Sequence, residues 1–301
     1  MIQKNILLRV FFSVFTMAVL VFISCSSGNA DKNTSRKPND TLAKKDSIKK
    51  QICTLKNDTT VVISGFPVDI ALPEKEAIGT ILVLNGWNFS RDHCCKNCTF
   101  CKEAKAKGFR LIMPEMGLSV YSKIIYPETR TDWRKYPTRT WIIETMIPFM
   151  QKHFNLLMQN ENNFLYGIST GSRGVALIAL HTKNIFRAGA ALSGDYDQTL
   201  MKNDNLMKGF YGNYDLFPDR WEGDENPFKN ASKYTIPIYF GHGLKDQVVA
   251  SEQTILFYKE LKRVRPEIGF ELHTDSLGGH NYKFWGSQTK AILEFFLKYK
   301  K

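Results

Sequence analysis

The sequence predicts an α/β fold in which a mostly parallel central sheet is covered by helices on both faces. Two observations lead to this prediction. Short apolar runs alternate along the chain with longer segments of helical periodicity. Several runs are apolar at every position, as in strands that are buried on both faces. Strands that alternate with helices form parallel sheets, because each helix carries the chain back across the sheet.

The clearest strand is the run Thr80-Ile81-Leu82-Val83-Leu84, which ends in Asn-Gly. The predicted strands cover residues 59–64, 67–72, 79–84, 110–114, 164–166, 188–192, 236–240 and 268–272. The predicted helices cover residues 141–157, 174–181, 251–264 and 289–298. In the third helix, Ile255, Tyr258 and Leu261 share a face opposite basic and acidic residues, as in a helix packed on one side. Residues 118–140 and 196–233 lack periodicity and are expected to form a loop-rich cap.

The chain of 301 residues suits one large domain with appendages. Its 43% hydrophobic and 13% aromatic residues exclude a disordered chain. The net charge is +12, but residues 1–50 carry nine Lys and Arg against three Asp, which is half of that excess. No stripe of basic and aromatic residues accompanies the remaining charge, so nucleic-acid binding is not expected.

Residues 1–24 have the pattern of an export signal. Lys4 and Arg9 precede an apolar run that is shorter than the roughly 20 residues of a membrane-spanning helix. The run ends in Phe-Ile-Ser-Cys25, which resembles the lipobox of bacterial lipoproteins. The resemblance implies a lipid on Cys25 and, with Ser26 next, attachment to the outer membrane or periplasmic face in a Gram-negative bacterium. The alternative is an ordinary signal peptide cleaved nearby, with Cys25 incidental.

Residues 25–55 are rich in Lys, Ser and Asn and are expected to form a flexible tether. The folded domain is expected to cover residues 56–301. Within this domain, Gly167-Ile168-Ser169-Thr170-Gly171 is a G-x-S-x-G motif between a predicted strand and a predicted helix. That setting presents a nucleophilic Ser169 on a sharp turn. A serine nucleophile also needs a base and an orienting acid.

Asp246 follows the predicted strand 236–240 in His-Gly-Leu-Lys-Asp-Gln-Val-Val, and His280 follows the last predicted strand in Gly-Gly-His-Asn-Tyr. With GISTG, these motifs resemble the α/β-hydrolase superfamily, most closely its esterase-like and dienelactone-hydrolase-like serine hydrolases. The resemblance covers residues 59–301 and implies a triad of Ser169, Asp246 and His280. It also implies oxyanion donors at the amides of Thr170 and Trp87, although Asn85-Gly86 stands where many relatives have His-Gly. No cofactor or metal is implied.

Alternatives remain for several of these roles. His242 is the rival to His280, and Asp195 or Asp197 is the rival to Asp246. The other histidines are expected to be structural or on the surface. Among the cap residues, an acidic or sugar substrate is expected to meet Trp133, Arg134, Tyr136 and Arg139, or else these residues form the exposed edge of a lid.

Four cysteines lie within eight residues: Cys94, Cys95, Cys98 and Cys101. An exported protein favours disulfides here, while an iron–sulfur or zinc site and free or redox-active thiols are the alternatives. With Cys53 and without Cys25 the count is odd, so the pairing cannot be read from the sequence.

The sequence therefore predicts a lipid-anchored serine hydrolase that cleaves carboxylic esters through an acyl-enzyme. A peptide or lactone substrate is an alternative. The expected partners are a small-molecule or glycan ester and, through the lipid, a membrane. The competing hypothesis is a non-catalytic lipoprotein of the same fold that binds a polysaccharide or peptide.

Overall fold

One mixed sheet of eight strands forms the centre of the molecule. In the computed structural model, residues 53–301 are described. The strand order is β1-β2-β4-β3-β5-β6-β7-β8. The strands are β1 (Thr59–Ile63), β2 (Phe66–Ala71), β3 (Gly79–Leu84), β4 (Phe109–Pro114), β5 (Asn163–Ile168), β6 (Ala188–Leu192), β7 (Ile238–Gly243) and β8 (Glu271–Asp275). β2 is antiparallel to β1 and β4, while the pairs from β4 to β8 are parallel. The predicted mostly parallel sheet is confirmed.

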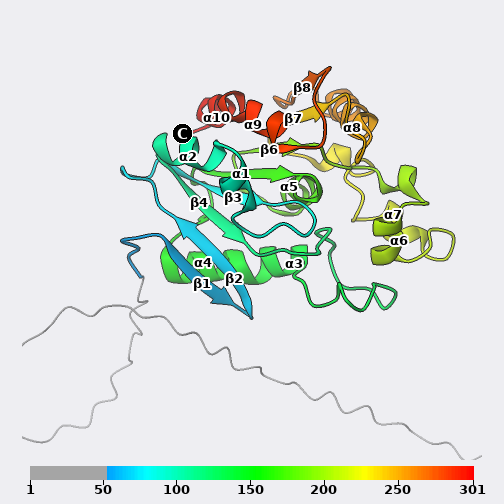
Figure 1. Ribbon diagram of the computed structural model, residues 1–301, viewed down its shortest axis with the longest axis horizontal. Helices are drawn as coiled ribbons and strands as arrows, with labels where there is room; N and C mark the ends of the chain where they lie inside the picture. Colours follow the sequence, from blue (N-terminus) through cyan, green and yellow to red (C-terminus); the bar gives the residue numbers. More distant parts are fainter. Residues whose placement is uncertain (1–52) are drawn as a thin grey trace, which may run out of the picture.

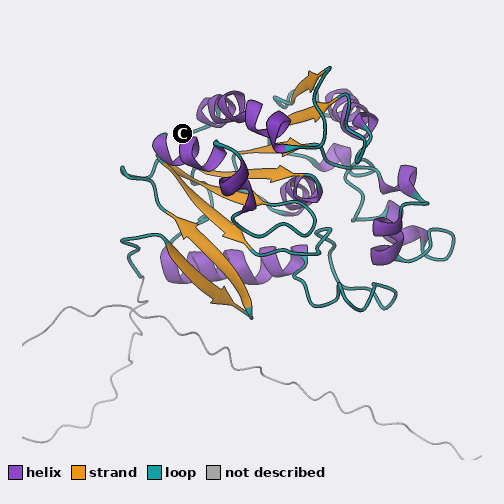
Figure 2. Ribbon diagram, viewed as in Figure 1, coloured by secondary structure: helices purple, strands orange, loops and turns teal. Residues whose placement is uncertain are grey.

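Helices cover both faces of this sheet (Figures 1 and 2). They are α1 (His93–Asn97), α2 (Phe100–Ala106), α3 (Arg139–Trp141), α4 (Ile147–Phe154), α5 (Thr170–His181), α6 (Asn205–Tyr211), α7 (Pro218–Glu222), α8 (Ser251–Val264), α9 (Tyr282–Ser287) and α10 (Thr289–Lys298). A π-helical turn, η1 (Ile142–Met146), joins α3 to α4, and two 3-10 turns are η2 (Gln198–Met201) and η3 (Ala231–Lys233).

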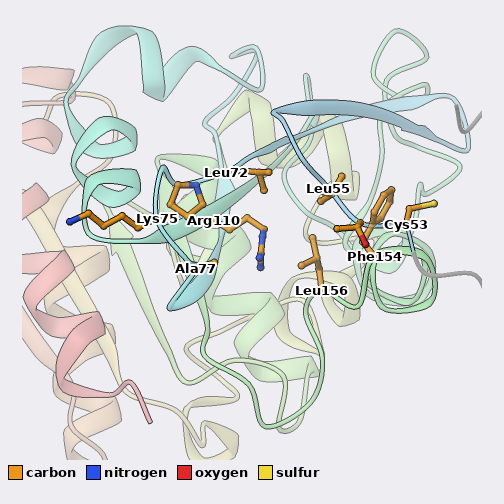
Figure 3. A pocket seen from close by; sticks show the side chains of 10 residues that line it. Cys53, Leu55, Leu72, Lys75, Ala77, Arg110, Phe154 and Leu156 are labelled. Carbon is orange, nitrogen blue, oxygen red and sulfur yellow. The ribbon is translucent and has the colours of Figure 1, made fainter. Parts of the chain in front are cut away.

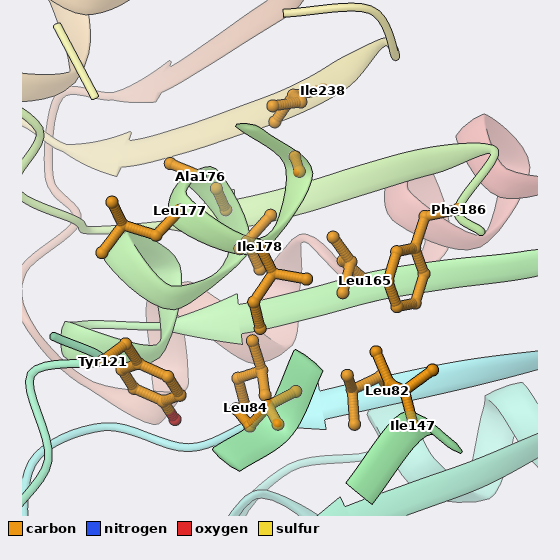
Figure 4. Close-up of a cluster of buried hydrophobic side chains, with 14 of the residues drawn as sticks. Leu82, Leu84, Tyr121, Ile147, Leu165, Ala176, Leu177, Ile178, Phe186 and Ile238 are labelled. Atoms are coloured by element: carbon orange, nitrogen blue, oxygen red, sulfur yellow. The ribbon is translucent and has the colours of Figure 1, made fainter. Parts of the chain in front are cut away.

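The hydrophobic core lies in two layers, one on each face of the sheet. Alternate residues of a strand point to opposite faces, so Leu82 and Leu84 lie on the side of α4 and α5 (Figure 4), in a cluster that extends to Phe257 of α8. Ile81 and Val83 pack on the other face with α1, α2, α9 and α10. Every residue of β5 is buried. This central strand holds the turn after it in a fixed position.

Two predicted elements differ from the observed ones. The single helix expected over 141–157 is interrupted by η1 and ends at Asn155, whose left-handed φ of 56° closes α4. Pro148 lacks an amide hydrogen, so it cannot continue the α-helical ladder from the preceding turn. The last strand covers residues 271–275 rather than 268–272. Ile268 and Phe270 are buried in the loop before it, whereas β8 is a half-exposed edge strand with polar residues.

The segments expected to form a cap lie beyond the carboxyl ends of the parallel strands. Figure 1 shows α6 and α7 at that end, beside the loop that precedes α3. Residues of both segments form a third apolar cluster, which includes Val120, Trp133, Phe210 and Trp221. The cap therefore has its own small core above the edge of the sheet.

The predicted export signal, Cys25 and most of the tether lie outside the described residues. Residues 53–55, which the prediction assigns to the tether, belong to the domain instead. The amide of Cys53 donates to the carbonyl of His153 at 2.8 Å, and Cys53 and Leu55 pack against the core. Among residues 53–301, no helix is long and apolar enough to cross a bilayer.

Candidate active site

Ser169 lies on a sharp turn between β5 and α5. Its φ and ψ are 54° and −125°, a conformation that L residues rarely adopt. The glycines on either side permit it. A Cβ at Gly167 would lie 2.2 Å from the carbonyl oxygen of Gly171, and a Cβ at Gly171 would lie 2.0 Å from that of Leu84. The two glycines of the motif therefore let strand and helix approach closely while the turn presents Ser169 at the carboxyl end of β5.

His280 contacts both Ser169 and Asp246. Its Nε2 is 2.9 Å from Ser169 Oγ, and its Nδ1 is 2.7 Å from Asp246 Oδ2. The three side chains come from the turns after β5 and β7 and from the loop between β8 and α9. Because these strands are parallel, their carboxyl ends meet at one edge of the sheet. The structure thus brings together the three residues that the motifs single out.

The carboxylate of Asp246 is surrounded by donors. Its Oδ1 accepts the amides of Val248 and Val249, each at 2.9 Å, and Nε2 of His242 is 3.3 Å from its Oδ2. Burial raises the pKa of Asp246, but the hydrogen bonds from His242, His280 and the two amides outweigh it. The pKa therefore lies well below its usual range. A charged Asp246 favours the tautomer of His280 with its proton on Nδ1, in which the unprotonated Nε2 faces Ser169 Oγ.

His242, the rival base, occupies a different position. It is fully buried, with Nδ1 2.6 Å from Thr254 Oγ1 and Nε2 3.0 Å from the carbonyl oxygen of Val249. Its contacts are with the turn that carries Asp246 and with α8. It is His280 that lies within hydrogen-bond distance of Ser169, and its side chain is 12% exposed.

The two expected oxyanion donors flank Ser169. Thr170 is the first residue of α5, where amides have no acceptor within the helix. Trp87 follows Gly86, and a Cβ at Gly86 would lie 3.0 Å from Cβ of Ser169. Outside the helices and strands of residues 53–301, no backbone hydrogen bond uses the Trp87 amide. Both amides are therefore free to donate to an oxygen that develops charge beside Ser169.

Comparison with known proteins assigns the family. The sequence profile of the prolyl oligopeptidase family matches residues 143–301, which include Ser169, Asp246 and His280. This match spans more than half of the chain. The chain belongs to the prolyl oligopeptidase family. It is a serine hydrolase.

Solved structures share the fold of this prolyl oligopeptidase family member. The serine hydrolase FphF of Staphylococcus aureus has 18% identity and a TM-score of 0.61, over 77% of this chain and 92% of its own. S-formylglutathione hydrolase from Agrobacterium tumefaciens has 14% identity and a TM-score of 0.64, over 78% and 90%. The acylaminoacyl peptidase of Pyrococcus horikoshii has 17% identity and a TM-score of 0.59, over 81% and 41%. No curated protein matches. These likenesses identify the α/β-hydrolase fold.

Arg173, which belongs to none of the sequence motifs, connects the cap to α5, the helix that follows Ser169. It is fully buried on α5, and its Nη1 donates to Asp195 Oδ2 at 2.9 Å. Its Nη2 donates to the hydroxyl of Tyr211 at 3.1 Å and to the carbonyl of Glu225 at 2.7 Å. An Arg four residues after Ser169, in a helix with no other Arg, Lys, Asp or Glu, is the sequence signal that could have identified it.

The rival acids serve this packing. Asp195 pairs with Arg173, and Asp197 accepts the amide of Thr199 at 3.1 Å and Nδ2 of Asn226 at 2.9 Å. Within residues 53–301, neither carboxylate lies within hydrogen-bond distance of His280. Both aspartates therefore help to anchor the cap.

The cap residues expected at the substrate behave differently from one another. Arg139 is 4% exposed and faces the buried Glu225, so its predicted contact with substrate is wrong. Arg134 donates to backbone carbonyls within the cap, and Tyr136 packs over Gly117. Trp133 packs edge-on against Trp87, with ring centroids 4.8 Å apart. An aromatic wall thus adjoins the loop that carries the expected oxyanion donor.

The cysteine cluster contains one disulfide, between Cys95 and Cys101. The thiols of Cys94 and Cys98 are 3.4 Å apart. The hydrogen bond between them is the largest influence on both, and it raises the pKa of Cys94 and lowers that of Cys98 to about 7. In the described part of the chain, no three His, Cys, Asp or Glu side chains are grouped as metal ligands.

Proposed function

We propose that the protein hydrolyses carboxylic esters through an acyl-enzyme, with Ser169 as nucleophile, His280 as base and acid, and Asp246 as the orienting acid. The proposal depends on one observation, the continuous contact from Ser169 Oγ through the His280 ring to Asp246 Oδ2. Ser169 alone is a weak nucleophile, and the imidazole of His280, with Nε2 2.9 Å from Ser169 Oγ, is positioned to remove its proton.

The reaction has two halves. Ser169 Oγ bonds to the ester carbonyl carbon while its proton passes to His280 Nε2, and the resulting oxyanion accepts hydrogen bonds from the amides of Thr170 and Trp87. The ester C–O bond then breaks as His280 returns the proton to the leaving alkoxide. Water attacks the acyl-enzyme with the same proton transfers, which releases the acid and restores Ser169.

Two substrate classes compete for this site. Family membership favours a peptide bond. The comparison structures that match over 90% or more of their own length are named as hydrolases or a ferulic acid esterase, whereas the acylaminoacyl peptidase matches over 41%. This contrast supports an ester, in a small molecule or a glycan, as the substrate.

Initial rates on p-nitrophenyl esters of increasing acyl length, beside a peptide p-nitroanilide, test the proposal. We expect ester cleavage to exceed anilide cleavage. Ser169→Ala should lower kcat/KM by about 10⁴-fold or more, with Ser232→Ala, an exposed serine, as the matched control. Full activity in Ser169→Ala would overturn the proposed nucleophile. Faster cleavage of the anilide would assign a peptidase instead.

We also propose that Cys25 carries the lipid that anchors the enzyme at the outer membrane or periplasmic face. The support is the lipobox-like sequence Phe-Ile-Ser-Cys25 and the polar residues after it. In cells that express the full chain, the protein should partition into the detergent phase, and Cys25→Ser should move it to the aqueous phase. Equal partitioning of the two proteins would contradict the anchor.

A further inference from the structure

Two adjoining cavities lie at the end of the sheet opposite Ser169. Their volumes are about 290 and 490 Å³, and Arg110 lines both. Arg110 is the second residue of β4 and pairs in register with Thr80, the second residue of β3, whereas Ser169 follows the last residue of the parallel strand β5. A ligand held at Arg110 is therefore separated from the candidate active site by the length of the sheet.

The guanidinium of Arg110 has little compensation for its burial. Its Nη1 donates to the hydroxyl of Thr80 at 3.1 Å, and its buried Nε has no hydrogen-bond partner. Across residues 53–301, no carboxylate pairs with it, and burial lowers its pKa. A cation removed from water is normally paired with an anion, because an unpaired buried charge is costly. Within residues 53–301 the guanidinium therefore has no anionic partner, and its Nη2, which is neither bonded nor fully buried, keeps a donor for a ligand in the cavity.

The surroundings of Arg110 are apolar on one side. Figure 3 shows Leu55, Phe154 and Leu156 gathered on that side of its guanidinium, while Lys75 extends away. The smaller cavity is lined by these side chains and by Leu72, and also by Thr54 and Lys75, so apolar side chains form one wall of it rather than the whole lining. Its volume is near the lower end of the range of about 300–1,000 Å³ that is typical of small-molecule sites. A guanidinium beside this apolar wall fits a ligand with a negative charge and an apolar body.

We propose that the smaller cavity binds a small amphiphilic carboxylate. The carboxylate accepts hydrogen bonds from Arg110, and the aliphatic body packs against Leu55, Leu72 and Leu156. A planar carboxylate suits a guanidinium, which presents its N–H groups in a fork, and one positive charge balances one negative charge. A phosphate would need further donors. Glu161, which is negatively charged like a phosphate, lines the larger cavity.

Calorimetric titration of octanoate into the Ser169→Ala protein tests this site, because that background cannot form an acyl-enzyme. We expect saturable binding that weakens by at least about tenfold in Ser169→Ala/Arg110→Gln. Ser169→Ala/Lys107→Gln, which removes an exposed cation directly after the end of α2, should bind like the Ser169→Ala protein. Octylammonium, with the same chain and the opposite charge, should not bind.

Three results would overturn the proposal: no binding of octanoate, equal binding after Arg110→Gln, or equal binding of octanol, which lacks the charge. Thermal unfolding supplies a second readout that also checks folding. Octanoate should raise the Tm of the Ser169→Ala protein but not that of the double variant with Arg110→Gln. Neither measurement requires catalysis, so failure of this proposal can be distinguished from failure of the proposed esterase activity.

Discussion

The two ends of the central sheet differ in the partners that they provide for buried charged side chains. At the carboxyl end, Asp246 accepts two backbone amides and contacts two imidazoles, and Arg173 donates to Asp195, Gln198, Tyr211 and Glu225. At the amino end, the guanidinium of Arg110 has one acceptor among the described residues, the neutral hydroxyl of Thr80. Nε of Arg173 lacks a partner just as Nε of Arg110 does, so the two ends differ in the anion: Arg173 is paired with Asp195, and Arg110 has no carboxylate partner within residues 53–301. In this sense of paired charge, the carboxyl end is a closed network and the amino end is open.

This contrast separates two ways of making a site. A closed network fixes its members before any substrate arrives, and catalysis benefits because the enzyme does not reorganise during the reaction. A charged group without a counter-ion can still bind a ligand, but it lowers the stability of the free protein. The same substitution should therefore have different consequences at the two ends.

The largest effect is expected at the centre of the closed network. Asp246→Asn replaces an acceptor by an amide that donates to His280 Nδ1, so the imidazole carries its proton on the wrong nitrogen. We expect kcat on a p-nitrophenyl ester to fall by about 10⁴-fold. The circular dichroism spectrum of the variant should match that of the wild type, which shows that the variant is folded. Asp215→Asn, at an exposed position, is the control. A loss below tenfold would show that Asp246 does not orient the base.

The next largest effect is expected at Arg173. Arg173→Met removes the guanidinium and leaves Asp195 buried without its cation. Breaking a buried pair in this way costs about 3–5 kcal/mol of unfolding free energy. Urea denaturation measures this change, and Arg263→Met on the exposed face of α8 should stay within about 0.5 kcal/mol of the wild type. Similar stabilities of the two variants would contradict a closed network.

Asp246 should also give the stability a specific pH dependence. Its pKa is lower in the folded protein than in the unfolded chain, where a carboxyl has a pKa of about 3.9. Its stabilising contribution is therefore complete above that value and is lost as the pH falls through the folded pKa. The difference in unfolding free energy between wild type and Asp246→Asn should shrink as the pH is lowered from about 7 to about 3. A difference that stays constant would exclude a lowered pKa.

The smallest effect, of opposite sign, is expected at the open end. Arg110→Met removes a half-buried cation that has no anionic partner in the part of the chain that the structure describes, and fills the same space with an apolar side chain. We expect the unfolding free energy to rise by up to about 1 kcal/mol in urea denaturation. A fall of about 2 kcal/mol or more would mean that Arg110 is already compensated in the free protein. Comparison with Arg173→Met gives the sharpest test of the difference between the two ends.

The sequence predicts the parts of this molecule that depend on local pattern. The buried strands, the helices α8 and α10, and the order of Ser169, Asp246 and His280 follow from apolar periodicity and from motifs set at strand ends. Residues 205–222 do not show their helices in this way, because α6 and α7 are short and pack on an aromatic cluster built from distant segments.

Partnerships between distant residues could not be predicted. The buried position of Arg139 depends on Glu225, which lies more than eighty residues further along the chain. The pairing of Cys95 with Cys101, rather than with Cys94 or Cys98, depends on how α1 and α2 meet. The lack of a carboxylate partner for Arg110 within residues 53–301 depends on which segments surround it, and no pattern in the sequence indicates this.

Covalent labelling with a fluorophosphonate probe, followed by peptide mapping, tests the central claim most directly. If His280 and Asp246 activate Ser169, the folded protein should carry one phosphonyl group on the peptide that contains Ser169. Labelling should fall to background in Ser169→Ala and slow strongly in His280→Ala. A folded protein that takes up no probe, or that carries it on another serine, would contradict the account.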